Sequence, residues 1–217
     1  MSEFATRRVM MVDTQVRPSD VTKFPIIDAM LSVPREAYVP GDKREAAYVG
    51  ENLDIGGGRV VLEARTLAKM LDALDIQPTE MVMDIGCGLG YSAAVIARLA
   101  DAVVAVEEDA ALAAEAQRLL SVEGVDNAAV VTGPLVKGAP KHAPYDVITI
   151  QGGVDTVPDA LLTQLKEGGR IAALFMDDGV GTAKVGYKID GRMTWRPLFN
   201  ASAPVLDGFA VQRGFTL

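Results

Sequence analysis

The sequence predicts an α/β protein with a doubly wound, mostly parallel seven-stranded sheet, an antiparallel C-terminal hairpin and an N-terminal helical extension. Apolar runs alternate with helical patterns, which is typical of a parallel sheet covered by helices on both faces. The runs lie at 81–85, 102–106, 128–132, 146–150 and 170–175, and the helical patterns at 91–100, 109–122 and 158–167. With 217 residues there is room for one substantial core. We expect residues 1–62 to form the helical extension and a substrate loop, and residues 63–217 to form the ligand-binding domain as a single compact unit.

The extension is predicted to contain a helix over residues 19–31. Its apolar residues share one helical face, and they are Ile26, Ile27, Met30 and Leu31. Pro25 suits a first turn and Pro34 stops the helix. Between residues 47 and 62 the sequence becomes irregular around Gly56-Gly57-Gly58. Such a segment before a periodic helix is a candidate lid or substrate loop, and a plain connector gives the same pattern.

Two further elements follow from periodicity. From Glu63 the apolar spacing becomes helical, with Leu67, Met70, Leu71 and Leu74 on one side. After residue 180 the alternation of strands and helices stops. Residues 184–189 and 194–199 then resemble two strands around Asp190-Gly191, a strong hairpin signal.

The segment from Met83 to Gly90, Met-Asp-Ile-Gly-Cys-Gly-Leu-Gly, follows a predicted strand and opens a predicted helix. Glycines allow a sharp turn and the close approach of a ligand. Glu107 lies 21 residues after Gly86, at the end of the next strand, where a carboxylate accepts hydrogen bonds from ribose hydroxyls. Together these features predict a site for an adenosine group, although a glycine-rich loop that merely closes a turn is the plain alternative.

The glycine spacing distinguishes between adenosine cofactors. A dinucleotide site requires Gly-x-Gly-x-x-Gly, which leaves room for a pyrophosphate at the helix N-terminus. This chain has Gly-x-Gly-x-Gly, with Asp84 two residues before the first glycine. A carboxylate there repels a pyrophosphate and suits an ammonium group. The layout resembles motif I of the class I S-adenosylmethionine-dependent methyltransferases, which have a Rossmann-like fold and whose cofactor carries an amino acid.

Ligands of an open α/β sheet bind outside the carboxyl ends of its strands. That rule adds the turn Thr132 to Leu135, expected beside adenine, and Gln151-Gly152-Gly153, expected beside the methyl acceptor. The predicted cofactor-binding residues are therefore Asp84, Gly86, Cys87, Gly88, Gly90, Glu107, Gly133 and Leu135. Cys87 fits best as a small residue beside the cofactor, and a reactive thiol is the alternative.

Composition excludes several function classes. The net charge is −8, and no run of Lys or Arg follows a phosphate backbone, so nucleic acid is not expected as a partner. No apolar stretch reaches the roughly 18 residues of a membrane span. One cysteine, Cys87, and one histidine, His142, make a disulfide impossible within the chain and a Cys/His metal site improbable. We expect a cytoplasmic protein without a metal, and the oligomeric state stays open.

Over nearly its whole length the chain resembles the protein-L-isoaspartate O-methyltransferases. Beyond motif I, the matching pieces are Val33-Pro34-Arg35-Glu36-Ala37-Tyr38-Val39-Pro40, Ala47-Tyr48, Leu53-x-Ile55-Gly56-x-Gly58, Val106-Glu107, Ala143-Pro144-Tyr145-Asp146 and Ala160-Leu161-Leu162-x-Gln164-Leu165-x-x-Gly168-Gly169-Arg170. The resemblance implies a repair enzyme that methylates the carboxylate of isoaspartyl residues in damaged proteins, with S-adenosylmethionine as cofactor.

The chain departs from the family in the substrate loop. After Ile-Gly-x-Gly the family has Gln-Thr-x-Ser, whereas this chain has Arg59, Val60, Val61 and Leu62, so both hydroxyls are absent. We assign Arg59, Val60, Leu62 and Gln151 to the acceptor site. Three hypotheses follow: an isoaspartyl methyltransferase in which Arg59 grips the acceptor carboxylate, a methyltransferase for a less polar acceptor, or an inactive module that binds S-adenosylmethionine. For Arg59, a solvated loop cation is the plain alternative.

Overall fold

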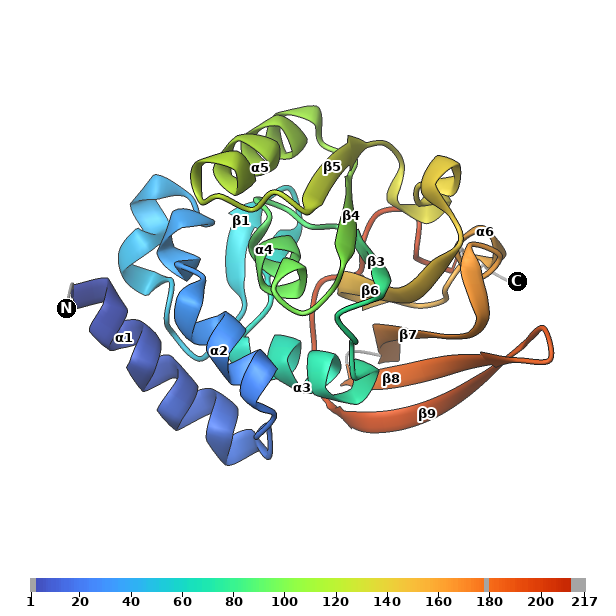
Figure 1. Cartoon of the computed structure of the whole chain (residues 1–217), viewed down its shortest axis with the longest axis horizontal. Helices are drawn as coiled ribbons and strands as arrows, with labels where there is room; N and C mark the ends of the chain where they lie inside the picture. Colours follow the sequence, from blue (N-terminus) through green and yellow to red (C-terminus); the bar gives the residue numbers. More distant parts are fainter. Residues whose placement is uncertain (1–2, 178–179, 212–217) are drawn as a thin grey trace, which may run out of the picture.

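A seven-stranded sheet in the order β5-β4-β3-β6-β7-β8-β9 forms the centre of the computed structural model, which describes residues 3–177 and 180–211 (Figure 1). The parallel strands are β3 (Met81–Ile85), β4 (Ala102–Glu107), β5 (Ala128–Thr132), β6 (Tyr145–Val154) and β7 (Leu165–Asp177). The strands β8 (Val180–Ile189) and β9 (Arg192–Asn200) complete the sheet antiparallel to their neighbours. The predicted fold, including the C-terminal hairpin, is confirmed.

Each face of the sheet is covered differently. One face packs against α2 (Phe24–Ser32), α3 (Ala64–Leu74), α4 (Tyr91–Ala97) and α5 (Ala110–Val122), whose apolar residues share a core with Val82, Val103 and Val147. On the other face Ile85, Ile148 and Ile171 pack against α6 (Asp159–Leu162), the 3-10 turn Leu135–Lys137 and a C-terminal segment that includes Leu206 and Phe209. Helices therefore dominate one face, while short turns and the C-terminal segment cover the other.

Two predicted helices end early. The pattern at 158–167 gives only α6, because the chain turns at Thr163 and Leu165 already pairs with Tyr145 as the first residue of β7. Gln164 stabilises this turn, since its side chain donates to the Ala160 carbonyl at 2.7 Å. The helix predicted at 91–100 ends at Ala97. In both places apolar spacing continues past the point where the backbone leaves the helix.

The N-terminal extension contains one helix more than the sequence indicates. Helix α1 (Glu3–Met11) precedes a π-helical turn at Val12–Val16 and a 3-10 turn at Arg17–Ser19. The predicted helix at 19–31 begins only at Phe24, because Asp20 has a left-handed conformation with φ of 66°. Pro25 lies in its first turn, as expected.

Residues 47–62, expected to be irregular, contain a small antiparallel hairpin of β1 (Leu53–Gly56) and β2 (Arg59–Val61). Its turn uses Gly57 and Gly58, with φ of 60° and 72°, values that favour glycine. The hairpin forms a separate two-stranded sheet outside the central one. The candidate lid is thus an ordered element, and its position over the glycine loop is described below.

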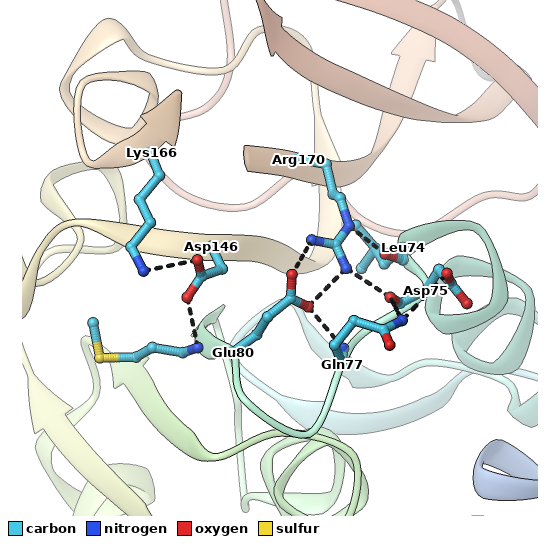
Figure 2. A network of polar contacts seen from close by, with 8 residues as sticks. Leu74, Asp75, Gln77, Glu80, Asp146, Lys166 and Arg170 are labelled. Atoms are coloured by element: carbon cyan, nitrogen blue, oxygen red, sulfur yellow. Dashed lines mark hydrogen bonds and ion pairs between the residues drawn. The ribbon is translucent and has the colours of Figure 1, made fainter. Parts of the chain in front are cut away.

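A polar network joins the amino ends of the central strands (Figure 2). Arg170 of β7 donates two hydrogen bonds to Glu80, at 2.6 and 2.8 Å, and others to the carbonyls of Leu74 and Asp75. Beside it, Asp146 of β6 pairs with Lys166 at 2.7 Å and accepts from the Met81 amide at 2.9 Å. Ligands of such sheets bind at the opposite, carboxyl edge, so this network serves stability.

Candidate cofactor and acceptor site

The glycine loop connects β3 to α4 at the carboxyl edge of the sheet. Gly86, Gly88 and Gly90 have φ of 77°, 56° and 95°, all in the left-handed region. A Cβ at Gly86 would lie 2.8 Å from Nη2 of Arg59, and one at Gly88 would lie 2.7 Å from Cδ1 of Ile55. The loop therefore requires glycine for its backbone and also for the close approach of the β1–β2 hairpin.

Glu107, the last residue of β4, is fully buried and receives five hydrogen bonds. Three come from the amides of Gly88, Glu108 and Asp109, at 2.8, 2.9 and 3.1 Å. The other two come from Arg59, whose Nη1 and Nη2 donate to the two carboxylate oxygens at 2.8 and 2.9 Å. The carboxylate predicted to bind ribose thus forms a bidentate ion pair with a residue of the hairpin.

Arg59 is 7% exposed, so it is not a solvated loop cation. It reaches Glu107 from β2, across 48 residues of sequence. Its Nε is buried and has no hydrogen-bond partner among the described residues. Binding of an acceptor carboxylate by Arg59 stays a prediction, and in this arrangement the guanidinium is engaged elsewhere.

Asp84, at the end of β3, is fully buried between two partners. Ser92 donates to one carboxylate oxygen at 2.6 Å and Gln151 to the other at 2.8 Å. Burial raises the pKa of Asp84 to about 6, and the two hydrogen bonds oppose that rise. Gln151, predicted at the acceptor site, therefore positions Asp84 in this structure, and its contact with an acceptor stays a prediction.

A small cavity of about 10 Å³ lies beneath the hairpin. The predicted acceptor residues Val60, Leu62 and Gln151 line it together with Cys87 and Ser92. Burial raises the pKa of the Cys87 thiol well above its ordinary value, which disfavours a reactive thiolate. A wider cleft of about 480 Å³ lies outside the hairpin and is lined by Arg59, Asp109 and Asp207, among others.

The turn expected beside adenine adjoins the glycine loop. The Gly133 amide donates to the Glu107 carbonyl at 3.0 Å. Leu135 is fully buried, and its Cδ1 lies 3.6 Å from the Cβ position of Gly86. The structure thus brings the predicted cofactor residues together at one edge of the sheet, and their contact with a cofactor stays a prediction.

Two features of the site were missed by sequence reasoning. Ser92, the partner of Asp84, had a signal, because it is a polar residue in the first turn after the glycine loop. The C-terminal segment had none, since its position depends on tertiary packing. Pro204 and Leu206 hydrogen-bond to Gly153, and a Cβ at Gly152 would lie 2.6 Å from the Leu206 side chain. This segment covers the carboxyl end of β6, where the acceptor is expected.

The described residues contain no group of three or more His, Cys, Asp or Glu side chains placed to hold a metal ion. Across residues 3–177 and 180–211, no helix has the length and apolar character that crossing a membrane requires.

Comparison with known proteins identifies similar chains. The family model described as protein-L-isoaspartate(D-aspartate) O-methyltransferase matches residues 8–190. A protein-L-isoaspartate O-methyltransferase of Syntrophus aciditrophicus is 37% identical over 171 residues, which are 79% of this chain and 78% of the relative. Protein-L-isoaspartate O-methyltransferase 1 of Rhodopseudomonas palustris is 38% identical over 170 residues, or 78% of this chain and 69% of the relative.

Solved structures agree with these sequence relatives. A protein-L-isoaspartate O-methyltransferase superposes with a TM-score of 0.81 at 26% identity, covering 93% of this chain and 66% of the other. A Plasmodium falciparum protein assigned the same activity, solved with S-adenosyl-L-homocysteine, gives a TM-score of 0.80 at 17% identity, covering 95% and 99%. At that identity the second likeness shows the fold alone.

Proposed function

Since the chain belongs to the protein-L-isoaspartate O-methyltransferase family, we propose that it is an S-adenosylmethionine-dependent methyltransferase that O-methylates the carboxylate of L-isoaspartyl residues in damaged proteins. The observation that carries the proposal is the joint presence of the glycine loop, Asp84 and Glu107 at one edge of the sheet. Damaged peptides and proteins are then its substrates. A cytoplasmic location and the lack of nucleic-acid partners stay predictions.

The chemistry of the residues present fits the cofactor. Glu107 would accept from two ribose hydroxyls through the carboxylate oxygens that Arg59 occupies in this structure, and Asp84 would offer a negative charge to an ammonium group. Gly86 and Gly88 present bare backbone to the hairpin residues Arg59 and Ile55, so a ligand that replaces these side chains can approach the loop closely. When bound, the cofactor supplies an electrophilic methyl group on a sulfonium.

At the acceptor side, little acid-base chemistry is required. An isoaspartyl carboxylate has a pKa near 4 and is ionised at pH 7, so no general base has to remove a proton. The tasks left to the chain are to position the carboxylate and to exclude water. Val60 and Leu62 form an apolar wall that excludes water, and Arg59 is the candidate ligand for the carboxylate.

A second candidate function is methylation of a less polar acceptor on the same fold. The observation that favours it is the run Val60, Val61 and Leu62, which lines the cavity where the family has hydroxyl groups. A third, a cofactor-binding module without turnover, is favoured by the absence of both hydroxyl groups from the acceptor loop, where Val60 and Leu62 stand.

Transfer of labelled methyl from S-adenosylmethionine to a synthetic isoaspartyl peptide tests the proposal, with the identical aspartyl peptide as control. We expect transfer to the isoaspartyl peptide alone. Glu107→Gln should abolish transfer, whereas the matched change Glu115→Gln, of an exposed carboxylate on α5, should not. Labelling of another component of a cell extract, without the peptide, would favour the second function. Binding of S-adenosylhomocysteine without transfer to any acceptor would favour the third.

A further inference from the structure

The ion pair between Arg59 and Glu107 occupies the carboxylate that the proposed cofactor needs. A carboxylate has about four lone-pair positions, and five N–H groups already point at Glu107. The three amide donors belong to the backbone next to Glu107 or to the glycine loop. Arg59 is a side chain from another element, so it is the donor that can leave.

We propose that Arg59 is a gate: its guanidinium competes with the ribose hydroxyls for Glu107, and the cofactor binds only after Arg59 and the β1–β2 hairpin that carries it move away. This inference rests on the proposed function for the identity of the ligand. It adds a regulatory step that depends on a residue of this chain, Arg59 of the hairpin.

The arrangement of space supports the gate. Arg59 lines the outer cleft of about 480 Å³, while the cavity beside Ser92 and Gln151, the two partners of Asp84, measures about 10 Å³. A ligand that contacts both Glu107 and Asp84 must extend from one space into the other. Small-molecule sites usually measure about 300–1,000 Å³, so the inner cavity admits such a ligand only when the hairpin moves.

The hairpin is suited to such movement. It is a two-stranded sheet separate from the central one, and Leu53 and Val61 anchor only the end away from its turn in the core, so movement is confined to the turn end that carries Arg59. A Cβ at Gly57 or Gly58 would meet nothing within 4 Å, so the turn projects into open space. Next to the turn, the hairpin is also held by an exposed pair, Lys43 with Asp54 at 3.1 Å. Exposed ion pairs of this kind contribute little to stability. The buried pair between Arg59 and Glu107 is therefore a major polar attachment of the turn end of the hairpin.

The closed position of Arg59 is also imperfect. Its Nε is buried without a partner, and an unsatisfied buried donor has a free-energy cost. The apparent dissociation constant of a ligand rises by the inverse of the fraction of molecules that are open. A gate that is open in about 5% of molecules therefore weakens cofactor binding about twentyfold.

Cys87 provides a direct readout of the gate. It is the only cysteine of the chain, it is 6% exposed, and it lines the cavity beneath the hairpin. The rate at which a maleimide labels this thiol reports opening without any need for cofactor or acceptor. We would compare the wild type with Arg59→Gln, and with Arg65→Gln as a matched control, since Arg65 forms an exposed pair with Glu63. Urea unfolding followed by Trp195 fluorescence tests whether each variant is folded.

We expect Arg59→Gln to label at least tenfold faster than the wild type and to bind S-adenosylhomocysteine at least fivefold more tightly in calorimetry, with Arg65→Gln unchanged in both. Arg59→Lys, which keeps the charge but loses the fork, should fall between them and serves if the glutamine variant is unfolded. Equal labelling of the wild type and a folded Arg59 variant would overturn the gate, even if the wild type binds S-adenosylhomocysteine. If Cys87 of the Arg59 variant is labelled faster but no variant binds S-adenosylhomocysteine, the result would support the opening of the hairpin and overturn the assignment of the ligand as this cofactor.

Discussion

Replacement of Asp84 by asparagine should stabilise the protein at neutral pH and weaken cofactor binding. In the folded protein Asp84 is fully buried, and burial raises its pKa to about 6. At pH 7 the folded state therefore contains a buried charge that the unfolded state solvates. Asparagine keeps both contacts, because its oxygen accepts from Gln151 and its amide donates to the Ser92 hydroxyl.

The size of the effect follows from the difference in pKa. The unfolded carboxyl has a pKa of about 3.9, so the folded value is higher by about two units, or about 3 kcal/mol at 1.36 kcal/mol per unit. Between pH 4 and pH 6 the folded state binds more protons than the unfolded state, so wild-type stability falls as the pH rises through this window. Below pH 4 the carboxyl is protonated in both states and the cost disappears. A gain of about 3 kcal/mol corresponds to a rise in Tm of roughly 6–12 °C for a chain of this size.

Thermal unfolding of the wild type and Asp84→Asn from pH 4 to pH 7.5 measures the difference, and Asp101→Asn controls for the loss of an exposed carboxylate. We expect the advantage of Asp84→Asn to be full at pH 7 and to vanish near pH 4, while calorimetry shows weaker binding of S-adenosylhomocysteine. An advantage that does not change with pH, or a variant less stable than the wild type at pH 7, would refute the assignment of the cost to a buried charge.

Two further changes separate stability from chemistry. Arg170→Met should lower the free energy of unfolding in urea by about 3 kcal/mol, because it leaves the carboxylate of Glu80 in a largely buried position without its partner, and it should leave S-adenosylhomocysteine affinity unchanged. A loss of affinity equal to that of a site variant would contradict the structural role of this network. Val60→Thr should raise kcat/KM for an isoaspartyl peptide several-fold, because it restores a hydroxyl in the cavity at a half-buried position. The same change at Val61, which is more buried, should lower stability without raising turnover, and equal kinetics of the two variants would argue against a role for the hydroxyl.

The central strands could be predicted because each one depends on a pattern of apolar residues within a short stretch of sequence. The strand at 81–85 and the core of each other central strand follow from apolar runs that a buried parallel sheet requires. The end of α6 could not be predicted, because it depends on pairing between Leu165 and Tyr145. Similarly, the glycines at 56–58 interrupt the apolar residues of the hairpin at 53–61, and its order depends on tertiary contacts of Leu53 and Val61 with the core and of Ile55 and Arg59 with the glycine loop.

Two family-like motifs also proved to be structural. Asp146 and Arg170 occur in segments that match the family, and both are charged residues of the kind that binding sites use. The structure places both at the amino edge of the sheet, where they attach neighbouring strands to one another and to the loop before β3 (Figure 2). Position along a parallel strand, and not residue type, separates stabilising from ligand-binding charges.

The contact between Arg59 and Glu107 shows why site residues are harder to predict than folds. On sequence, Glu107 is a ribose ligand and Arg59 an unusual cation in the acceptor loop, and no local rule relates residues 48 positions apart. In the structure they form one buried ion pair. An arginine in a loop that covers a buried carboxylate forms an ion pair with it, because a carboxylate accepts strong, charge-assisted hydrogen bonds from a guanidinium group. Arg59 therefore contacts the carboxylate predicted to bind ribose, and the effect of replacing it on cofactor binding has to be measured before any effect on catalysis is assigned to the acceptor.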